Sequence, residues 1–393
     1  MEHLFSDRVK KLKASEIREI LKLTQRPEII SFAGGLPAPE MFPVEAYKAM
    51  SIKVMDEMGR EAMQYSTTEG YDPLREKIAK RMQASGVRVS KEDLLITNGS
   101  QQGLDFTGKI FINPGDYVLC ESPSYLGAIN AFRAYECEFK EVETDSEGMV
   151  MDALKEAIDQ HPKAKYIYVI PDFQNPSGRT WSESRRKELV ELANQYNLII
   201  IEDNPYGELR YEGEAIPPVK AFDTEGRVVY LGTFSKTFSP GLRIGWVCAS
   251  PLLLNKYITV KQGADLQASS MSQRVLNAFL ENYDFDAHIR AIINVYHKRR
   301  DLMFSEMKKH FPQNAKYEIS KGGLFAWVEL PEHVDARELM KLAVSNKVAF
   351  VPGGSFFPNG GKENYMRLNF SNMPEPKIVE GIERLGKILS KEI

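Results

Sequence analysis

The feature that most constrains the fold is a regular alternation of short apolar runs and helix-like segments in the middle of the chain. Each run is apolar at consecutive positions, as expected for strands that helices cover on both faces. The alternation therefore predicts an α/β fold with a mainly parallel central sheet. The runs are LLIT (94–97), YVLCE (117–121), YIYVIP (166–171), LIIIED (198–203), VVYLGT (228–233) and IGWVC (244–248).

Both ends of the chain differ from this middle. After about residue 285, a long charged helix leads to GGLFAWVEL (322–330), another helix and two short strand-like pieces. The first 45 residues are too few to hold a core alone, so they are expected to fold back onto this C-terminal part. We predict an N-terminal arm over residues 1–45, a large domain over 46–285 and a smaller α+β domain over 286–393 that the arm joins.

Composition excludes several classes of protein. The 393 residues include 51 Lys and Arg against 54 Asp and Glu, a formal net charge of −3, which argues against a nucleic-acid or membrane-surface binder. No run approaches the roughly 20 apolar residues of a membrane span, and the N-terminus lacks the apolar core of a signal peptide. The three cysteines form no CxxC pair. We therefore expect a cytoplasmic protein without a disulfide framework.

A possible anion site follows the first of these runs. The strand is expected to end at Thr97 and a helix to begin near Ser100, followed by Gln101. Helix N-termini bind anions because their first N–H groups are unpaired and carry the positive end of the helix dipole. The alternative is an ordinary helix capped by Ser100. Neither a Walker loop nor GxGxxG occurs in the chain.

Lys236 follows the run that ends at residue 233 and is flanked by Phe234 and Phe238. Partial burial and a cationic neighbour such as Arg243 would both lower the lysine pKa and favour a nucleophilic amine. Ser235 and Arg243 are candidates to bind phosphate oxygens. The alternative is a surface lysine at the end of a strand.

Asp203 ends the most apolar run, with Tyr206 three residues later. A carboxylate at the end of a parallel strand points toward the crevice where ligands of such sheets bind, and it could hold a proton on a heteroaromatic nitrogen. The alternative is an Asp that caps the following turn, Asn204-Pro205.

Three further residues are candidates, each with a plainer alternative. Asn175 follows a run within FQNPSG, which could simply be a loop of turn-forming residues. Tyr125 could stack on a flat ring or belong to the core. Arg367 lies between Met366 and Leu368, so its guanidinium could bind a carboxylate opposite the apolar face, or be solvated.

Together these features match the chemistry of pyridoxal 5′-phosphate (PLP), which has one phosphate, one flat pyridine ring and one aldehyde that condenses with an amine. The six histidines form no HxxxH or HxH pair, and no GxSxG is present. We therefore expect no metal site and no serine-hydrolase chemistry.

Across essentially its whole length the sequence resembles the PLP-dependent class I/II aminotransferases of fold type I, and in particular their 2-aminoadipate, lysine-biosynthesis and aromatic subgroup. Nine segments in the family's order carry the resemblance: SFAGGLPAPEMFP (31–43), YSTTEGYDPLR (65–75), NGSQQ (98–102), FQNPSG (173–178), EDNPY (202–206), SKTFSPGLRIGW (235–246), KGGLFAWVEL (321–330), FVPGG (350–354) and MRLNF (366–370).

The resemblance implies a role for each matching residue. Lys236 resembles the lysine that forms a Schiff base with PLP, and Asp203 the partner of the pyridine nitrogen. The other cofactor contacts are implied at the ring hydroxyl (Asn175 and Tyr206), the ring face (Tyr125) and the phosphate (Ser100, Gln101, Ser235 and Arg243). Asn204-Pro205 is a departure, since relatives often carry other residues there.

The resemblance also implies substrate contacts and a partner chain. Arg367 is similar to the arginine that binds the substrate α-carboxylate, assisted by Asn175 and by backbone near Gly35. Tyr65 matches a tyrosine that reaches the phosphate of the neighbouring subunit, which implies a homodimer with composite sites. Arg18 occupies the place of an arginine that contacts the substrate side chain.

The implied reaction is transfer of the α-amino group of an L-amino acid to a 2-oxo acid, expected to be 2-oxoglutarate, by ping-pong kinetics. A 2-aminoadipate, aromatic or branched-chain donor remains open, because apolar pockets discriminate weakly between side chains. A PLP-dependent β-lyase or decarboxylase is the main alternative. A non-catalytic PLP-binding regulator would need a DNA-binding domain, and a nicotinamide dehydrogenase would need its glycine fingerprint.

Overall fold

The centre of the computed structural model, which describes residues 1–10 and 26–393, is a seven-stranded sheet. Its order is β2 (Leu94–Thr97), β10 (Gly245–Cys248), β9 (Val228–Thr233), β8 (Ile199–Asn204), β7 (Ala164–Val169), β3 (Tyr117–Glu121) and β4 (Glu138–Val142). The strands from β9 to β4 are mutually parallel, whereas β10 is antiparallel to both of its neighbours. The predicted α/β fold with a mainly parallel sheet is confirmed.

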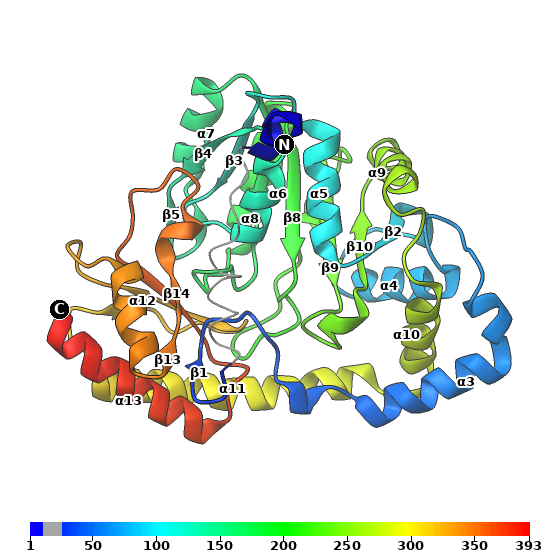
Figure 1. Cartoon of the computed structure of the whole chain (residues 1–393). Helices are drawn as coiled ribbons and strands as arrows, with labels where there is room; N and C mark the ends of the chain where they lie inside the picture. Colours follow the sequence, from blue (N-terminus) through cyan, green and yellow to red (C-terminus); the bar gives the residue numbers. More distant parts are fainter. Residues whose placement is uncertain (11–25) are drawn as a thin grey trace.

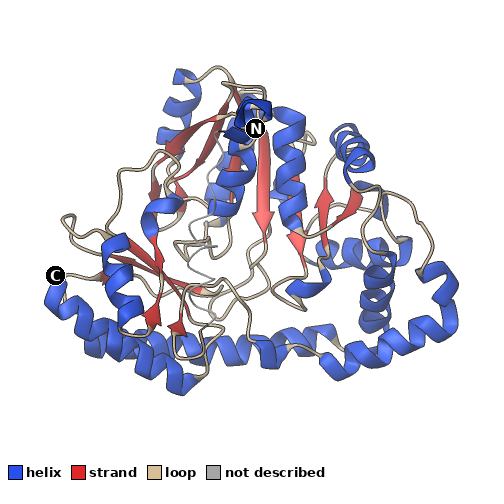
Figure 2. Cartoon of the chain, viewed as in Figure 1, coloured by secondary structure: helices blue, strands red, loops and turns tan. Residues whose placement is uncertain are grey.

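Helices cover both faces of this sheet (Figures 1 and 2). Neighbouring residues of β8 show why the strand is apolar at consecutive positions. Ile201 packs in one core cluster with Leu104, and Ile200 packs in another with Leu189. The α-helices of the described residues 1–10 and 26–284 are α1 (Asp7–Lys10), α3 (Val44–Ala62), α4 (Asp72–Ala84), α5 (Ser100–Phe111), α6 (Leu126–Arg133), α7 (Met151–Gln160), α8 (Glu183–Gln195), α9 (Pro251–Ala264) and α10 (Ser270–Asn282).

The C-terminal part of the chain forms a second sheet, of four antiparallel strands. Its order is β11 (Lys316–Tyr317), β12 (Phe325–Glu329), β15 (Tyr365–Asn369) and β14 (Val351–Pro352). The accompanying helices are α11 (Phe285–His310), α12 (Ala336–Ser345) and α13 (Glu375–Glu392), and a separate short hairpin joins β5 (Thr144–Asp145) to β6 (Gly148–Met149). Figure 1 shows α13 lying along α11.

The N-terminal segment returns to this C-terminal part. Strand β1 (Ile30–Ser31) pairs in parallel with β13 (Val348–Ala349). Ile30 and Phe32 are buried in the same core cluster as Met303 of α11 and Ile382 of α13. The predicted return of the N-terminal arm is therefore confirmed, while the domain boundaries at residues 45 and 285 stay a prediction.

The carboxyl ends of the mutually parallel strands lie along one side of the central sheet (Figure 2). The loops that follow these strand ends carry most of the candidate residues. This side is where open α/β sheets bind ligands. Within residues 1–10 and 26–393, no helix combines the length and the apolar character needed to cross a bilayer.

Candidate active site

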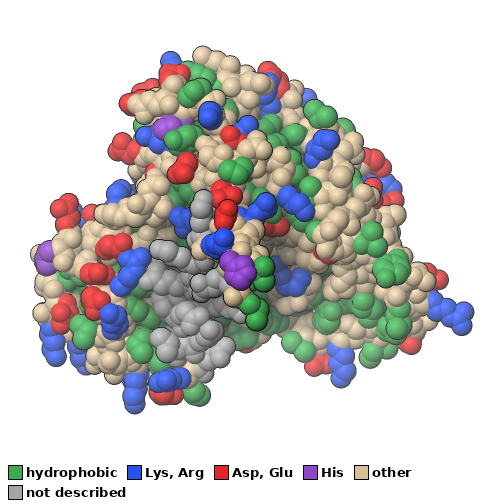
Figure 3. Space-filling model, turned by 45° about the horizontal axis from the view of Figure 1, so that its top comes forward, with side chains coloured by type: hydrophobic (Ala, Val, Ile, Leu, Met, Phe, Trp, Pro, Cys, Tyr) green, Lys and Arg blue, Asp and Glu red, His purple; other side chains and the backbone are tan. Residues whose placement is uncertain are grey.

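A cavity of about 430 Å³ lies at this side of the sheet, and most of the predicted site residues line it. Figure 3 shows acidic and basic side chains interspersed over one face of the molecule, with Lys and Arg side chains around a hollow near its centre. The predicted residues that line the cavity are Gly35, Ser100, Gln101, Tyr125, Asn175, Asp203, Tyr206, Ser235, Lys236, Arg243 and Arg367.

Two predicted residues are not among those that line the cavity. Tyr65 follows α3 and has 78% of its side chain exposed within the single chain. Arg18 lies outside the described residues. The implied roles of both residues therefore stay predictions.

Lys236 follows β9 and directs its amine into the cavity. Its Nζ donates a hydrogen bond of 2.8 Å to the carbonyl oxygen of Gly35. Burial, together with the positive charges of Arg367 and Arg243, lowers the pKa of Lys236 to about 8. The alternative of a surface lysine is wrong, and about a tenth of this amine is neutral and nucleophilic at pH 7.

Asp203 presents an unpaired carboxylate oxygen in the same cavity. Its Oδ2 accepts a hydrogen bond of 3.0 Å from the Tyr168 hydroxyl, whereas its buried Oδ1 has no partner among the described residues. Burial raises the pKa of Asp203 to about 7, and the bond from Tyr168 opposes that rise. Asp203 does not cap the following turn, because the acceptor there is Asn204 Oδ1, which binds Gly207 N–H at 2.8 Å.

The opposite end of the cavity favours an anion. Helix α5 begins at Ser100, but its N-cap is Gly99, and no side chain accepts from its first turn. The alternative of a serine-capped helix is therefore wrong. Gln102 N–H binds Gly99 O at 3.2 Å, which leaves the N–H groups of Ser100 and Gln101 as the candidates to bind an anion. Arg243 lies beside this helix end, where its Nη2 donates to Asn98 O at 3.1 Å. Gly99 has a φ of +74°, which favours glycine, and a Cβ atom there would come within 2.2 Å of Arg243 Nη2 and displace the guanidinium.

Arg367 is buried, with only 3% of its surface exposed, so the alternative of a solvated arginine is wrong. Its Nη1 donates to Asn175 Oδ1 and its Nη2 to Ala33 O, each at 2.8 Å. The guanidinium lies 4.3 Å from the ring centre of Phe325, and its Nε has no partner. Burial lowers the pKa of Arg367 to about 10, which leaves it charged at neutral pH.

Two tyrosines complete the cavity. Tyr125 precedes α6, and a Cβ atom on Gly127 would come within 2.4 Å of its ring, so glycine is what lets this ring lie against the helix. Tyr206 is buried, with its ring edge toward Phe325 at a centroid distance of 6.0 Å. Burial raises the pKa of Tyr206, and a hydrogen bond with Asn175 opposes that rise.

Several functional contacts were missed from the sequence. Tyr168 lies in an apolar run, and its hydroxyl bond to Asp203 depends on the pairing of β7 with β8. The one available indication was that a buried tyrosine hydroxyl usually needs a polar partner. Phe325 and Phe356 flank Arg367, and nothing local in the sequence indicates these contacts.

Comparison with known proteins identifies the family. Residues 34–385 match the family described as aminotransferase class I and II. The chain belongs to this family. The aromatic-amino-acid aminotransferase 1 of Thermococcus litoralis is 47% identical over 397 residues, which cover 100% of this chain and 95% of that relative. The 2-aminoadipate transaminase of Thermus thermophilus is 42% identical over 383 residues, which cover 96% and 94%.

A solved relative indicates the cofactor. The α-aminoadipate aminotransferase of Thermus thermophilus, crystallised with N-(5′-phosphopyridoxyl)-L-leucine, matches with a TM-score of 0.93 and 39% identity over 99% of this chain and 98% of that one. The predicted resemblance to PLP-dependent aminotransferases of fold type I is confirmed. This aminotransferase acts on amino and 2-oxo acids and uses PLP.

The residues of the cavity fit PLP. The unpaired Oδ1 of Asp203 is an acceptor that a protonated ring nitrogen would satisfy. The N-terminus of α5 and Arg243 offer donors and positive charge for a phosphate. The Lys236 amine lies in the same cavity and could react with an aldehyde.

Proposed function

We propose that this aminotransferase moves the α-amino group of an L-amino acid of the 2-aminoadipate, aromatic or branched-chain type to 2-oxoglutarate. The observation that carries the proposal is the presence of one amine, one unpaired carboxylate oxygen and one buried guanidinium in a single cavity, from Lys236, Asp203 and Arg367. The names of the relatives, which include aromatic and 2-aminoadipate aminotransferases, support this range of donors.

PLP, when bound, supplies an aldehyde that condenses with an amine and a pyridinium ring that accepts the electron pair left at the substrate Cα. Asp203 holds the proton on the ring nitrogen, because its unpaired oxygen needs a donor. Arg243, Ser235, Ser100 and Gln101 bind the phosphate, partly through the N–H groups of the first turn of α5.

The remaining cofactor contacts fix the ring. Tyr125 stacks on one face of the ring, which suits its position at the start of α6. Asn175 and Tyr206 donate toward the ring oxygen and favour its ionised form. Lys236 would remove the substrate Cα proton, as a base whose pKa of about 8 suits work near neutral pH.

Arg367 binds the substrate α-carboxylate, with Asn175 and the backbone at Gly35 assisting. Replacing Arg367 by lysine is expected to raise KM for amino and 2-oxo acids alike by about 10- to 100-fold, because a point charge cannot keep the bonds to Asn175 and Ala33 and also form a planar pair with a carboxylate. Steady-state kinetics with both substrates measures this effect.

Arg290 is a suitable control for this variant, because it lies on α11 with its side chain 65% exposed. Arg290→Lys is expected to leave both KM values unchanged. Unchanged KM values in Arg367→Lys for every amino and oxo acid would count against the carboxylate role.

We also propose a homodimer in the cytoplasm. Tyr65, Met63, Met55 and Ile52 are exposed along α3 and just after it, as expected for a face that a second copy covers. Tyr65 then reaches the phosphate of the neighbouring site.

The three cysteines are free thiols, which is the state expected in a reducing compartment such as the cytoplasm. A monomer in sedimentation equilibrium would refute the homodimer. Secretion of the protein from its own cells would refute the cytoplasmic location.

The reaction itself is tested with a panel of donors. We expect 2-aminoadipate, phenylalanine or leucine to yield its 2-oxo acid only when 2-oxoglutarate is present, with one glutamate formed per product. Initial rates should give the parallel double-reciprocal lines of ping-pong kinetics. Product without an acceptor would indicate a lyase or decarboxylase, and no turnover of any of these donors with 2-oxoglutarate would overturn the proposed substrate range.

A further inference from the structure

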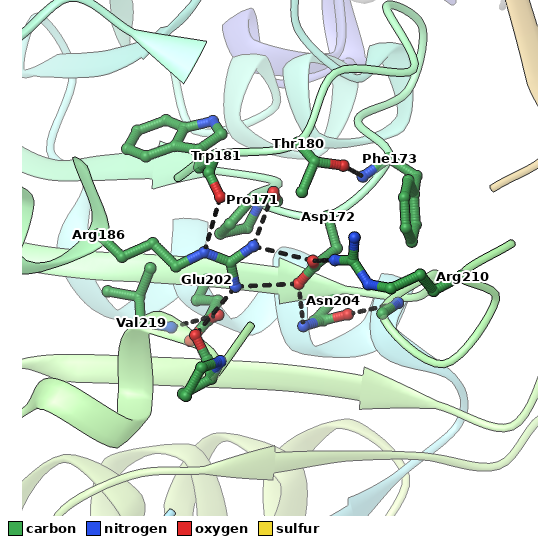
Figure 4. Close-up of polar contacts among 12 residues, drawn as sticks. Pro171, Asp172, Phe173, Thr180, Trp181, Arg186, Glu202, Asn204, Arg210 and Val219 are labelled. Carbon is green, nitrogen blue, oxygen red and sulfur yellow. Dashed lines mark hydrogen bonds and ion pairs between the residues drawn. The ribbon is translucent and has the colours of Figure 1, made fainter. Parts of the chain in front are cut away.

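A cluster of polar side chains surrounds Asp172, and Figure 4 shows the side chains that form it. At its centre the buried carboxylate of Asp172 accepts from Arg186 Nη2 at 2.8 Å, from Arg186 Nη1 at 3.1 Å and from Arg210 Nη2 at 3.2 Å. The Arg186 side chain is fully buried, and Asp172 retains only 4% exposure. Asn204 Nδ2 donates the fourth hydrogen bond to this carboxylate, at 3.1 Å.

Asn204 connects this cluster to the proposed active site, because it is the neighbour of Asp203 in the sequence. It is the last residue of β8 and follows Asp203 directly, so strand alternation directs the two side chains to opposite faces. Asp203 lines the cavity, whereas Asn204 contacts the cluster. Asn204 Oδ1 also accepts from Gly207 N–H at 2.8 Å, which closes a turn around Pro205 and Tyr206.

This position requires an amide. Asn204 must donate to a carboxylate on one side and accept from a backbone N–H on the other, and among side chains of this length only asparagine does both. Glycine at position 207 leaves room for the Asn204 side chain, because a Cβ atom there would come within 2.5 Å of Asn204 Oδ1. Asp172 in turn lies three residues before Asn175, so the cluster joins the loops that carry Asn175 and Tyr206.

We propose that Asn204 is a positioning residue: by binding Asp172 and Gly207 together, it fixes the turn that holds the Tyr206 hydroxyl toward the cofactor ring. The proposal rests on the proposed function, which gives Tyr206 a donor role at the ring oxygen. A hydrogen bond donated to an ionised oxygen favours the ionised form, so a displaced hydroxyl raises the pH at which the bound cofactor changes its absorbance.

The test is a pH titration of the absorbance of the holoenzyme. We expect Tyr206→Phe to raise the midpoint because it removes the hydroxyl outright, and Asn204→Ala to raise it by about one pH unit. The kcat of Asn204→Ala should fall by about 10-fold, as expected for a displaced contact. Because Asn204 acts through Tyr206, the double variant should have the midpoint of Tyr206→Phe alone.

Two further variants keep the test decisive. Tyr257→Phe removes a buried hydrogen bond to Thr107 elsewhere in the fold, so it should lower stability without moving the midpoint. If Asn204→Ala does not fold, Asn204→Ser retains an acceptor for Gly207 N–H, is too short to reach Asp172, and should still raise the midpoint.

The outcomes separate this proposal from the function on which it rests. A midpoint that moves in Tyr206→Phe but not in the Asn204 variants, or shifts that add in the double variant, would overturn the positioning role alone. A midpoint that does not move in Tyr206→Phe would overturn the donor role of Tyr206 and the positioning role together.

Discussion

Replacing Lys236 by alanine is expected to lower kcat by about 10⁴-fold, the upper end of what a positioned proton donor and acceptor contributes. Among the described residues that line the cavity, Lys236 is the one primary amine. In the proposed reaction, its loss removes both the base for the substrate Cα proton and the amine that would join PLP covalently to the chain. The fold should persist, since the hydrogen bond that is lost is a single one to Gly35 O.

Single-turnover absorbance with excess amino acid measures the lost step directly. Lys256→Ala, which removes an exposed lysine of α9, is the matched control and should keep full turnover. Borohydride treatment of the parent should attach the cofactor to the peptide that contains Lys236, and no such adduct should form on that peptide in the variant. Added methylamine should restore part of the variant's rate, because a free amine can enter the vacated space. Undiminished transamination in Lys236→Ala would refute the assignment of the base.

The position of the site could be predicted from the sequence because it depends on local features. Asn175 and Lys236 each follow an apolar run within a few residues, and Asp203 ends one. The carboxyl ends of parallel strands meet at one edge of a sheet, so these side chains had to come close together. The reversed direction of β10 could have been predicted as well, because segment 234–244 is short for a parallel crossover of a dozen or more residues.

The elements and contacts that escaped prediction depend on residues far apart in the sequence. Strand β4 reads EFKEV, and its charged residues suit a strand at the edge of the sheet but hide it among polar segments. The sequence also left open whether Asp203 faces the ligand crevice or caps the following turn. That choice was decided by how far β8 extends, because a strand that runs through Asn204 turns Asp203 toward the cavity.

The burial of Arg367 was hidden for the same reason. The alternation of Met366, Arg367 and Leu368 correctly placed the guanidinium opposite the apolar side chains, but it could not show that this second face is covered too. Phe325 from β12 and Phe356 from the segment after β14 lie against the guanidinium, and only the pairing of β15 with its neighbours brings them there.

Replacing Asp203 by asparagine is expected to change activity and stability in opposite directions. Asparagine has nearly the same shape and can still accept from the Tyr168 hydroxyl, but its neutral amide cannot hold a proton on the ring nitrogen of PLP. Without the protonated ring, the electron pair left at Cα is poorly stabilised. We expect kcat to fall by about 10²- to 10³-fold, as for the loss of one electrostatic contact to developing charge.

The stability of the cofactor-free protein should rise in the same variant. The pKa of Asp203 is raised from its ordinary 3.8 to about 7 in the folded chain, so the unfolded chain ionises first as the pH increases. Folding stability therefore falls between about pH 4 and pH 7 and then levels off, at a cost of at most about 4 kcal/mol. Asparagine does not titrate, so the difference in Tm between Asp203→Asn and the parent should be small at pH 4 and largest at pH 8.

Glu202 provides the matched control, because it is the preceding residue of β8, is fully buried and has its pKa raised to about 7 by burial. Its carboxylate accepts from Val219 N–H and Lys220 N–H beside the Asp172 cluster (Figure 4), and strand alternation puts it on the face opposite Asp203. Glu202→Gln should therefore keep kcat within a few-fold of the parent, whereas Asp203→Asn should not. If the Tm difference between Asp203→Asn and the parent does not grow from pH 4 to pH 8, the Asp203 carboxyl of the parent ionises at little cost in folding free energy. An unchanged kcat would remove Asp203 from the proposed site.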